Sequence, residues 1–181
     1  MNMSRHGSRG SNEFSACKIG QDDIVIHTHT QDELLHATDS MVAQAQRSVR
    51  ILSRDTDPEI YNRDAFTALL GRLISRHSRA ARVRILIGDP RPATQVTHRL
   101  IELWHRFPSF IELRELRDEY AKNQEAFVIV DDIGIVRRPH HASPEAVVVF
   151  RSLTTARDRA AWFDEAFERG APSSTLRRLS L

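Results

Sequence analysis

Two arginines and two histidines stand together in the C-terminal part of the chain, in a combination that could act on a phosphorylated group. Arg137 and Arg138 precede Pro139, and His140 and His141 follow it. Imidazoles can transfer protons or bind metals, and guanidinium groups hold phosphate oxygens in pairs. Arginine is common throughout this chain, so a solvated loop also accounts for the four residues. The segment is a candidate anion-binding site.

A second pair of imidazoles, His27 and His29, lies on one side of an extended segment, with Asp32 nearby. Two imidazoles supply half of a zinc site, but no third ligand follows at a recognisable spacing. We therefore predict neither a metal nor a cofactor, and we interpret the pair as structural.

The composition indicates one globular domain of 181 residues and gives little information about ligands. Basic residues number 26 and acidic residues 24, a balance that does not argue for nucleic acid or an acidic membrane. Two of the 26 are lysines, Lys18 and Lys122, and the other 24 are arginines. The single cysteine, Cys17, cannot form an intrachain disulfide, and no apolar run approaches the ~20 residues of a membrane helix. We expect a cytoplasmic protein.

Short apolar strands alternate with amphipathic helices along the chain. Strands are predicted at 24–26, 49–52, 83–87, 110–116, 127–130, 133–136 and 147–150, and helices at 30–48, 66–74, 96–107 and 155–170. Capping spacings, Thr30 to Glu33 and Thr155 to Asp158, mark the start of the first and last helices. This order predicts an α/β fold with a mixed, largely parallel sheet, helices on both faces, and the uniformly apolar strand 127–130 at its centre.

The ends of the chain differ in composition from this domain. Residues 1–22 have few large apolar side chains and predict a disordered N-terminal tail. The domain is therefore expected over 23–172, followed by a C-terminal tail over 173–181.

The apolar strand 127–130 and the residues around it resemble the signature of phospholipase D-like domains, His-x-Lys-x4-Asp-x6-Gly-Ser-x-Asn. Asp131 ends the strand and matches the signature aspartate. Counting back from Asp131, Gln124 stands at the histidine position and Ala126 at the lysine position. The aspartate is the one residue of the main motif that survives.

Beyond Asp131, this sequence can be aligned with the signature by spacing, but the residue types differ. Arg138 and Pro139 stand at the Gly-Ser positions, and His141 stands at the asparagine position. Glu145 precedes the last strand much as a family glutamate does. The pattern covers residues 24–170, and the Leu-Arg-x-Leu ending at 176–179 is similar to an uncharacterised bacterial branch of these domains. The resemblance implies a three-layer α/β/α sandwich.

In this family a histidine attacks phosphorus, a second histidine protonates the leaving oxygen, and lysines and asparagines stabilise the developing charge. Gln124 is a poor nucleophile and Ala126 carries no charge. The resemblance therefore implies a catalytically silent domain that binds or scaffolds. The possible anion-binding or ligand-binding residues are Gln124, Asp131, Arg137, Arg138, His140, His141 and Glu145.

Two alternatives stay open on the sequence. A divergent phosphoryl-transfer enzyme would use His141 with Asp131 or Glu145, and a nucleic-acid-binding module would use the arginines. The expected ligand contains phosphate, and no membrane partner is expected. Since active relatives with one motif pair their motifs across a two-fold axis, a homodimer through 124–131 and 140–145 is also expected.

Overall fold

The computed structural model describes residues 12–177, apart from residues 96 and 121. Its strands are β1 (Val25–Thr28), β2 (Ser48–Ser53), β3 (Arg82–Ile87), β4 (Ile111–Glu115), β5 (Ala126–Val130), β6 (Gly134–Arg138), β7 (Ala146–Val149) and β8 (Ala171–Pro172). Its helices are α1 (Asn12–Ala16), α2 (Gln31–Val42), α3 (Pro58–Tyr61), α4 (Asp64–Arg76), α5 (Arg91–Thr94), α6 (Arg99–Arg106), the 3-10 turn η1 (Asp118–Tyr120), α7 (Leu153–Arg169) and α8 (Ser174–Arg177).

All eight strands join one sheet in the order β1-β7-β6-β5-β2-β3-β4-β8. The sheet is mixed, but the expectation that it is largely parallel is wrong. Only the β2–β3 and β3–β4 pairs are parallel, and the other five pairs are antiparallel. The physical reason is that β5, β6 and β7 follow one another through loops too short for a helical crossover, so each strand must reverse direction.

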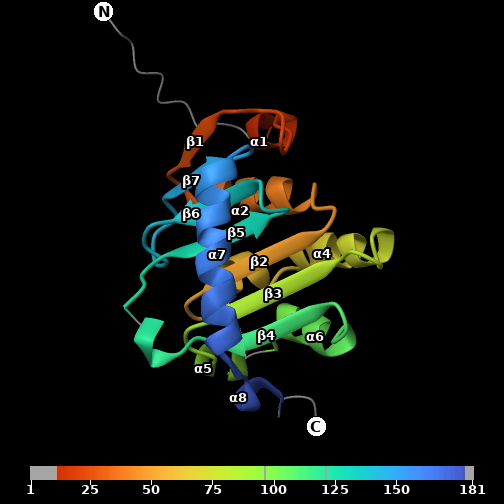
Figure 1. Cartoon of the computed structure of the whole chain (residues 1–181), viewed down its shortest axis with the longest axis vertical. Helices are drawn as coiled ribbons and strands as arrows, with labels where there is room; N and C mark the ends of the chain where they lie inside the picture. Colours follow the sequence, from red (N-terminus) through yellow and green to blue (C-terminus); the bar gives the residue numbers. More distant parts are fainter. Residues whose placement is uncertain (1–11, 96, 121, 178–181) are drawn as a thin grey trace, which may run out of the picture.

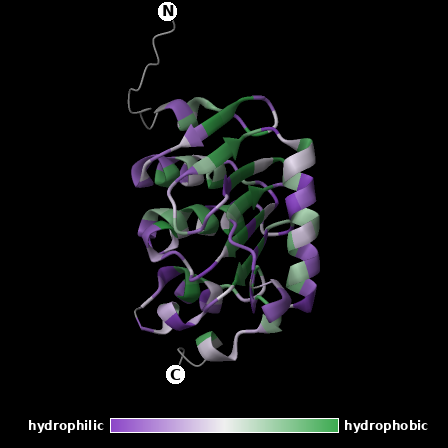
Figure 2. Cartoon of the chain, turned by 90° about the vertical axis from the view of Figure 1, so that its left-hand side faces the viewer, coloured by the Kyte–Doolittle hydropathy of each residue, from purple (hydrophilic) through white to green (hydrophobic). Residues whose placement is uncertain are grey.

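Helices cover both faces of this sheet, which gives the three layers expected (Figure 1). On one face α2, α4 and α6 pack on alternate residues of the strands, such as Val49 and Ile51. On the other face α7 packs alone, across Leu52, Leu86 and Phe127. Figure 2 shows the hydrophobic strands enclosed between these two helical layers. The central strand β5 is buried along its whole length, as its apolar sequence predicts.

Local signals place most helix boundaries. Thr30 forms the predicted capping box with Glu33, but α2 ends at Val42, before the expected end near Ser48. The start of α7 is also corrected, because Ser152 caps it and accepts a hydrogen bond from the backbone of Thr155. Sequence spacing alone cannot choose between two overlapping capping patterns, and the position of β7 decides in favour of Ser152.

The ordered chain extends beyond 23–172 at both ends. Residues 12–22, expected as part of a disordered tail, contain α1, whose Phe14 is fully buried in the core. At the other end Leu176 is fully buried, and α8 packs near α5. In each case one large apolar side chain reaches a gap in the helical layer, and its burial offsets the cost of ordering the segment. Residues 1–11 and 178–181, including the end of the Leu-Arg-x-Leu tail, lie outside the described residues.

Helix α7 is attached to the sheet by an aspartate between two arginines. Arg50 and Arg84 are register partners on β2 and β3, and both point to the α7 face. Asp164 of α7 accepts two hydrogen bonds from Arg50, each 2.9 Å, and one of 3.3 Å from Arg84. The guanidinium of Arg84 also lies 5.3 Å from the centre of the Phe167 ring. The contact therefore combines charge pairing with packing.

Replacing Asp164 with alanine is expected to lower the free energy of unfolding by about 1–3 kcal/mol, because two partly buried arginines lose a shared acceptor. Chemical denaturation monitored by circular dichroism measures this change. Glu165→Ala is the matched control, since Glu165 is exposed and its ion pair is with Arg169 on the same helix. Equal losses for the two variants would contradict the assigned role of Asp164.

Candidate functional site

Apart from the aspartate, the signature positions meet at one edge of the sheet, where β2 and β6 end and β5 begins. We call this the signature edge and define it by Ser53, Gln124, Ala126, Arg138 and His141. Ala126 is the register partner of Arg138, and the backbone amide of His141 donates to the carbonyl of Gln124 at 2.8 Å. The tertiary structure thus brings together several positions that the alignment with the signature singles out.

Arg138 occupies the interior of the signature edge. Its side chain is buried, and its guanidinium forms an ion pair with Asp57, whose side chain is mostly buried. The same guanidinium donates to the carbonyl oxygen of His141 at 2.5 Å, and the Ser53 hydroxyl donates to Asp57 at 2.9 Å. The Arg138 guanidinium, the Asp57 carboxylate and the Ser53 hydroxyl form one cluster, and each of them has a partner inside the protein.

Strained backbone and an aromatic side chain complete the cluster. Asp57 and the preceding Thr56 have φ values of 36° and 70°, a left-handed conformation that aspartate tolerates better than most residues. Tyr61 is buried next to the ion pair, and burial raises the pKa of its hydroxyl far above 10, although Arg138 acts in the opposite direction. Tyr61 therefore stays neutral and cannot act as a base at physiological pH.

Four of the predicted site residues lie on or near the signature edge but do not converge. The Gln124 and His140 side chains are exposed, and Glu145 is exposed on the loop that leads into β7. Arg137 points to the α7 face, where it pairs with Glu125. Arg159 of α7 shares that carboxylate at 3.1 Å. The four side chains at 137–141 are thus divided between the two faces of the sheet and the loop.

Asp131 lies at the opposite edge of the sheet. We call this the turn edge and define it by the β5–β6 turn and the start of β2, residues 131–133 and 46–48. Five-residue strands at about 3.3 Å per residue put Asp131 roughly 16 Å from the signature edge. The pairing of His141 with Asp131 is therefore not formed in the monomer, and the predicted dimer patch 124–131 spans two edges.

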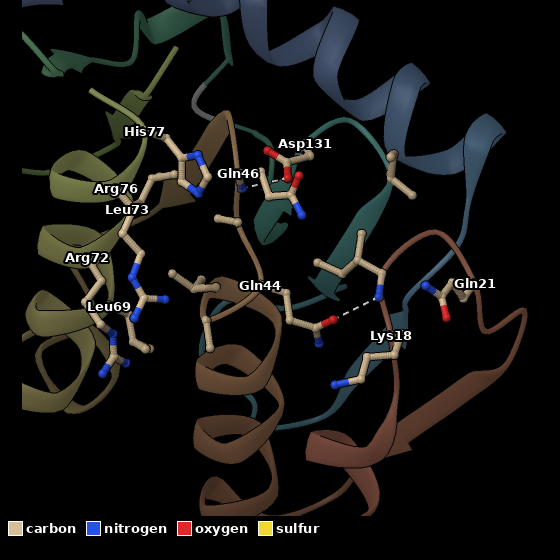
Figure 3. A pocket seen from close by; sticks show the side chains of 15 residues that line it. Lys18, Gln21, Gln44, Gln46, Leu69, Arg72, Leu73, Arg76, His77 and Asp131 are labelled. Atoms are coloured by element: carbon tan, nitrogen blue, oxygen red, sulfur yellow. Dashed lines mark hydrogen bonds between the residues drawn. The ribbon is translucent and has the colours of Figure 1, made fainter. Parts of the chain in front are cut away.

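The contacts of Asp131 explain its position. Its carboxylate accepts backbone hydrogen bonds from Gln46, Arg47 and Ser48, at 2.9, 2.8 and 2.8 Å. Asp131 and Asp132 have φ values of 54° and 59°, as a tight two-residue hairpin turn requires. The surviving signature aspartate therefore joins the turn to the first residues of β2 and lies on the wall of a pocket at the turn edge (Figure 3).

Sequence reasoning missed Ser53, Asp57 and Tyr61, the residues that enclose Arg138. The available signal was that an aspartate and a serine follow the carboxyl end of an internal strand, where polar side chains gather in open α/β sheets.

Two further predictions concern metals and membranes. Within residues 12–177, excluding the two positions not described, no group of three histidine, cysteine or acidic side chains is arranged to hold a metal ion. In the same part of the chain, no helix has the length and hydrophobicity needed to cross a bilayer.

Solved structures share this fold at low sequence identity. The archaeal chromatin protein TrmBL2, whose structure is described as showing a novel mode of DNA binding, matches 84% of this chain and 54% of its own, with a TM-score of 0.62 and 14% identity. NucT from Helicobacter pylori matches 83% of this chain and 99% of its own, with a TM-score of 0.57 and 12% identity.

Phosphatidylserine synthase from Haemophilus influenzae Rd KW20 matches 87% of this chain, with a TM-score of 0.56 and 11% identity. This chain spans about half of the TrmBL2 chain and 42% of the synthase chain. All three belong to the phospholipase D superfamily, so the fold is phospholipase D-like. No curated protein matches this sequence.

One family model, described as a domain of unknown function (DUF7931), matches residues 30–179, which include every strand from β2 to β8 and both edges of the sheet. The chain therefore belongs to the DUF7931 family and has the phospholipase D-like fold.

Proposed function

We propose that this chain is a non-catalytic phospholipase D-like domain that acts by binding. The observation that carries the proposal is the ion pair at the signature edge between the buried Arg138 and the mostly buried Asp57, both of which have further hydrogen bonds inside the protein. An active site of this kind needs a free nucleophile and unpaired donors facing the phosphoryl group. At the signature edge, the buried cation is Arg138, and Asp57 already neutralises it.

The neighbouring positions support the same proposal. Gln124 cannot form a covalent phosphoryl intermediate, and Ala126 is fully buried and apolar. Loss of the nucleophile and of its electrostatic partner removes the covalent route, and residual binding cannot replace it. His141 remains nearby, but its backbone is fixed between Gln124 and Arg138, and Asp131 lies at the other edge.

The test is a phosphodiesterase assay of the full chain with bis-nitrophenyl phosphate and with single-stranded DNA. We expect no turnover above that of a His140→Ala/His141→Ala variant prepared in the same way. Turnover by the unmodified chain that the double variant loses would overturn the proposal and favour the divergent enzyme. A Gln124→His variant serves as a second control, because a single restored imidazole without the lysine should also give no turnover.

A further inference from the structure

A pocket of about 480 Å³ opens at the turn edge, far from the signature edge (Figure 3). Its walls come from the segment that precedes β1, the end of α2, the second half of α4 and the β5–β6 turn. Pockets of this size accommodate small molecules. Four segments that are distant in the sequence therefore meet around one hollow.

Three cationic side chains line this pocket, together with amide side chains. Lys18 lies on one side, and Arg72, Arg76 and His77 lie on the other (Figure 3). The one carboxylate in the lining belongs to Asp131, and both of its oxygens accept backbone hydrogen bonds. The lining thus carries three cationic side chains against one carboxylate, which gives the pocket a net positive charge.

These cations differ from most arginines in the protein. Among the described residues, the side chains of Lys18, Arg72 and Arg76 form no hydrogen bond or ion pair. By contrast, carboxylates pair with Arg50, Arg63, Arg84, Arg91, Arg99, Arg114, Arg137, Arg138, Arg159 and Arg169. Exposed arginines elsewhere in the described part of the chain, such as Arg79 and Arg157, also have no such partner, so what distinguishes Lys18, Arg72 and Arg76 is that all three line one pocket.

The arrangement also has an energetic cost in the empty protein. Arg72 and Arg76 are four residues apart on α4, so they lie on the same face of the helix, where like charges repel. Arg76 is in the last turn and complements the helix dipole, but Arg72 lies one turn earlier and gains less from it. A bound anion would remove this repulsion and satisfy both guanidinium groups.

The half-buried amide of Gln44 holds the backbone on either side of Lys18, opposite the arginines. The Gln44 side chain accepts from the backbone of Ile19 at 3.0 Å and donates to the carbonyls of Cys17 and Ser40 at 2.9 and 3.2 Å. These three bonds tie the segment before β1 to the end of α2. The backbone that carries Lys18 is therefore positioned before any ligand arrives, which lowers the entropic cost of binding.

We propose that this pocket binds a small phosphorylated molecule through its phosphate group. Guanidinium pairs hold phosphate oxygens bidentately, and an ammonium group adds a point charge from the other side. The remaining volume, next to apolar side chains such as Leu69 and Leu73, would hold the organic part of the ligand. This site is separate from the signature edge, so it does not depend on the proposed loss of catalysis.

Isothermal titration calorimetry of the full chain with inorganic phosphate, inorganic pyrophosphate and adenosine monophosphate tests the proposal. We expect saturable binding to at least one of these probes and a loss of about tenfold or more in affinity for Arg72→Ala/Arg76→Ala. Arg106→Ala/Arg157→Ala removes the same charge from exposed positions outside the pocket and should bind like the unmodified chain. Circular dichroism of each variant confirms that it is folded.

Three outcomes would overturn the proposal. The first is no heat of binding from any of the probes at millimolar concentration. The second is an equal loss of affinity in both double variants, which would indicate non-specific attraction. The third is tight binding of single-stranded DNA that none of the three probes displaces, which would assign the cations to a nucleic acid instead.

Discussion

Replacing Asp57 with asparagine is expected to lower the free energy of unfolding by about 3–5 kcal/mol, because the change leaves the buried Arg138 guanidinium without its counter-charge. The Arg138 and Asp57 side chains have relative accessibilities of 6% and 13%, so water cannot replace the lost carboxylate. At about 2–4 °C per kcal/mol for a chain of this size, the melting temperature should fall by roughly 6–20 °C.

The asparagine substitution isolates the charge. Asparagine tolerates the left-handed backbone conformation observed at Asp57, so the strain at this position changes little. It also keeps a side-chain oxygen that can accept from the Ser53 hydroxyl. Thermal unfolding followed by circular dichroism, together with urea denaturation, measures the effect.

An exposed ion pair provides the matched control. Asp64 pairs with Arg99 at 2.6 Å, but both side chains are exposed, and Asp64→Asn should cost less than about 1 kcal/mol. Adding Arg138→Met to Asp57→Asn should recover part of the lost stability, since the unpaired charge is then removed as well. If Asp57→Asn and Asp64→Asn have the same effect, the ion pair does not stabilise the signature edge.

Replacing Asp131 with alanine is expected to lower the free energy of unfolding by about 2–4 kcal/mol. Three backbone amides at the start of β2 lose a charged acceptor, and the alanine must adopt the left-handed conformation of a tight hairpin turn. Urea denaturation measures the change. The β2–β5 pairing next to the turn should also exchange its amide hydrogens faster, which hydrogen exchange detects.

Asparagine at position 131 separates these contributions. One carboxylate oxygen accepts from both Arg47 and Ser48, and an amide oxygen can keep those two bonds while the bond from Gln46 is lost. Asp131→Asn should therefore cost clearly less than Asp131→Ala. Asp132→Asn is the control, because Asp132 is more exposed and pairs only with Arg50. A loss for Asp132→Asn as large as that for Asp131→Ala would contradict the role assigned to Asp131.

Much of the fold follows from local sequence. The apolar runs 49–52, 83–87 and 127–130 lie within β2, β3 and β5, because buried strands require uniform hydrophobicity. Thr30 begins α2 through the capping box that its spacing to Glu33 predicts. These signals depend on neighbours within four residues, so no knowledge of the remaining chain is needed to interpret them.

The direction of the strands and the order at the two ends of the domain could not be predicted from local sequence. A strand sequence reads similarly in parallel and antiparallel pairs, and only the tertiary structure showed that β5 pairs with β2, and β7 with β1, in antiparallel directions. Phe14 and Leu176 lie in segments of polar composition, and a single apolar residue gives no periodicity to detect.

The same distinction between sequence and tertiary structure applies to the candidate site. The sequence by itself determined that the histidine and lysine of the signature are replaced by Gln124 and Ala126, since residue types at fixed offsets need no coordinates. Only the tertiary structure decided that Arg138 is buried against Asp57 and that Asp131 lies at the opposite edge. Likewise, only the structure brought Lys18 to the same pocket as Arg72 and Arg76. Charges more than 50 residues apart have no fixed spacing, so their meeting depends on how the helices and the segment before β1 pack around the sheet.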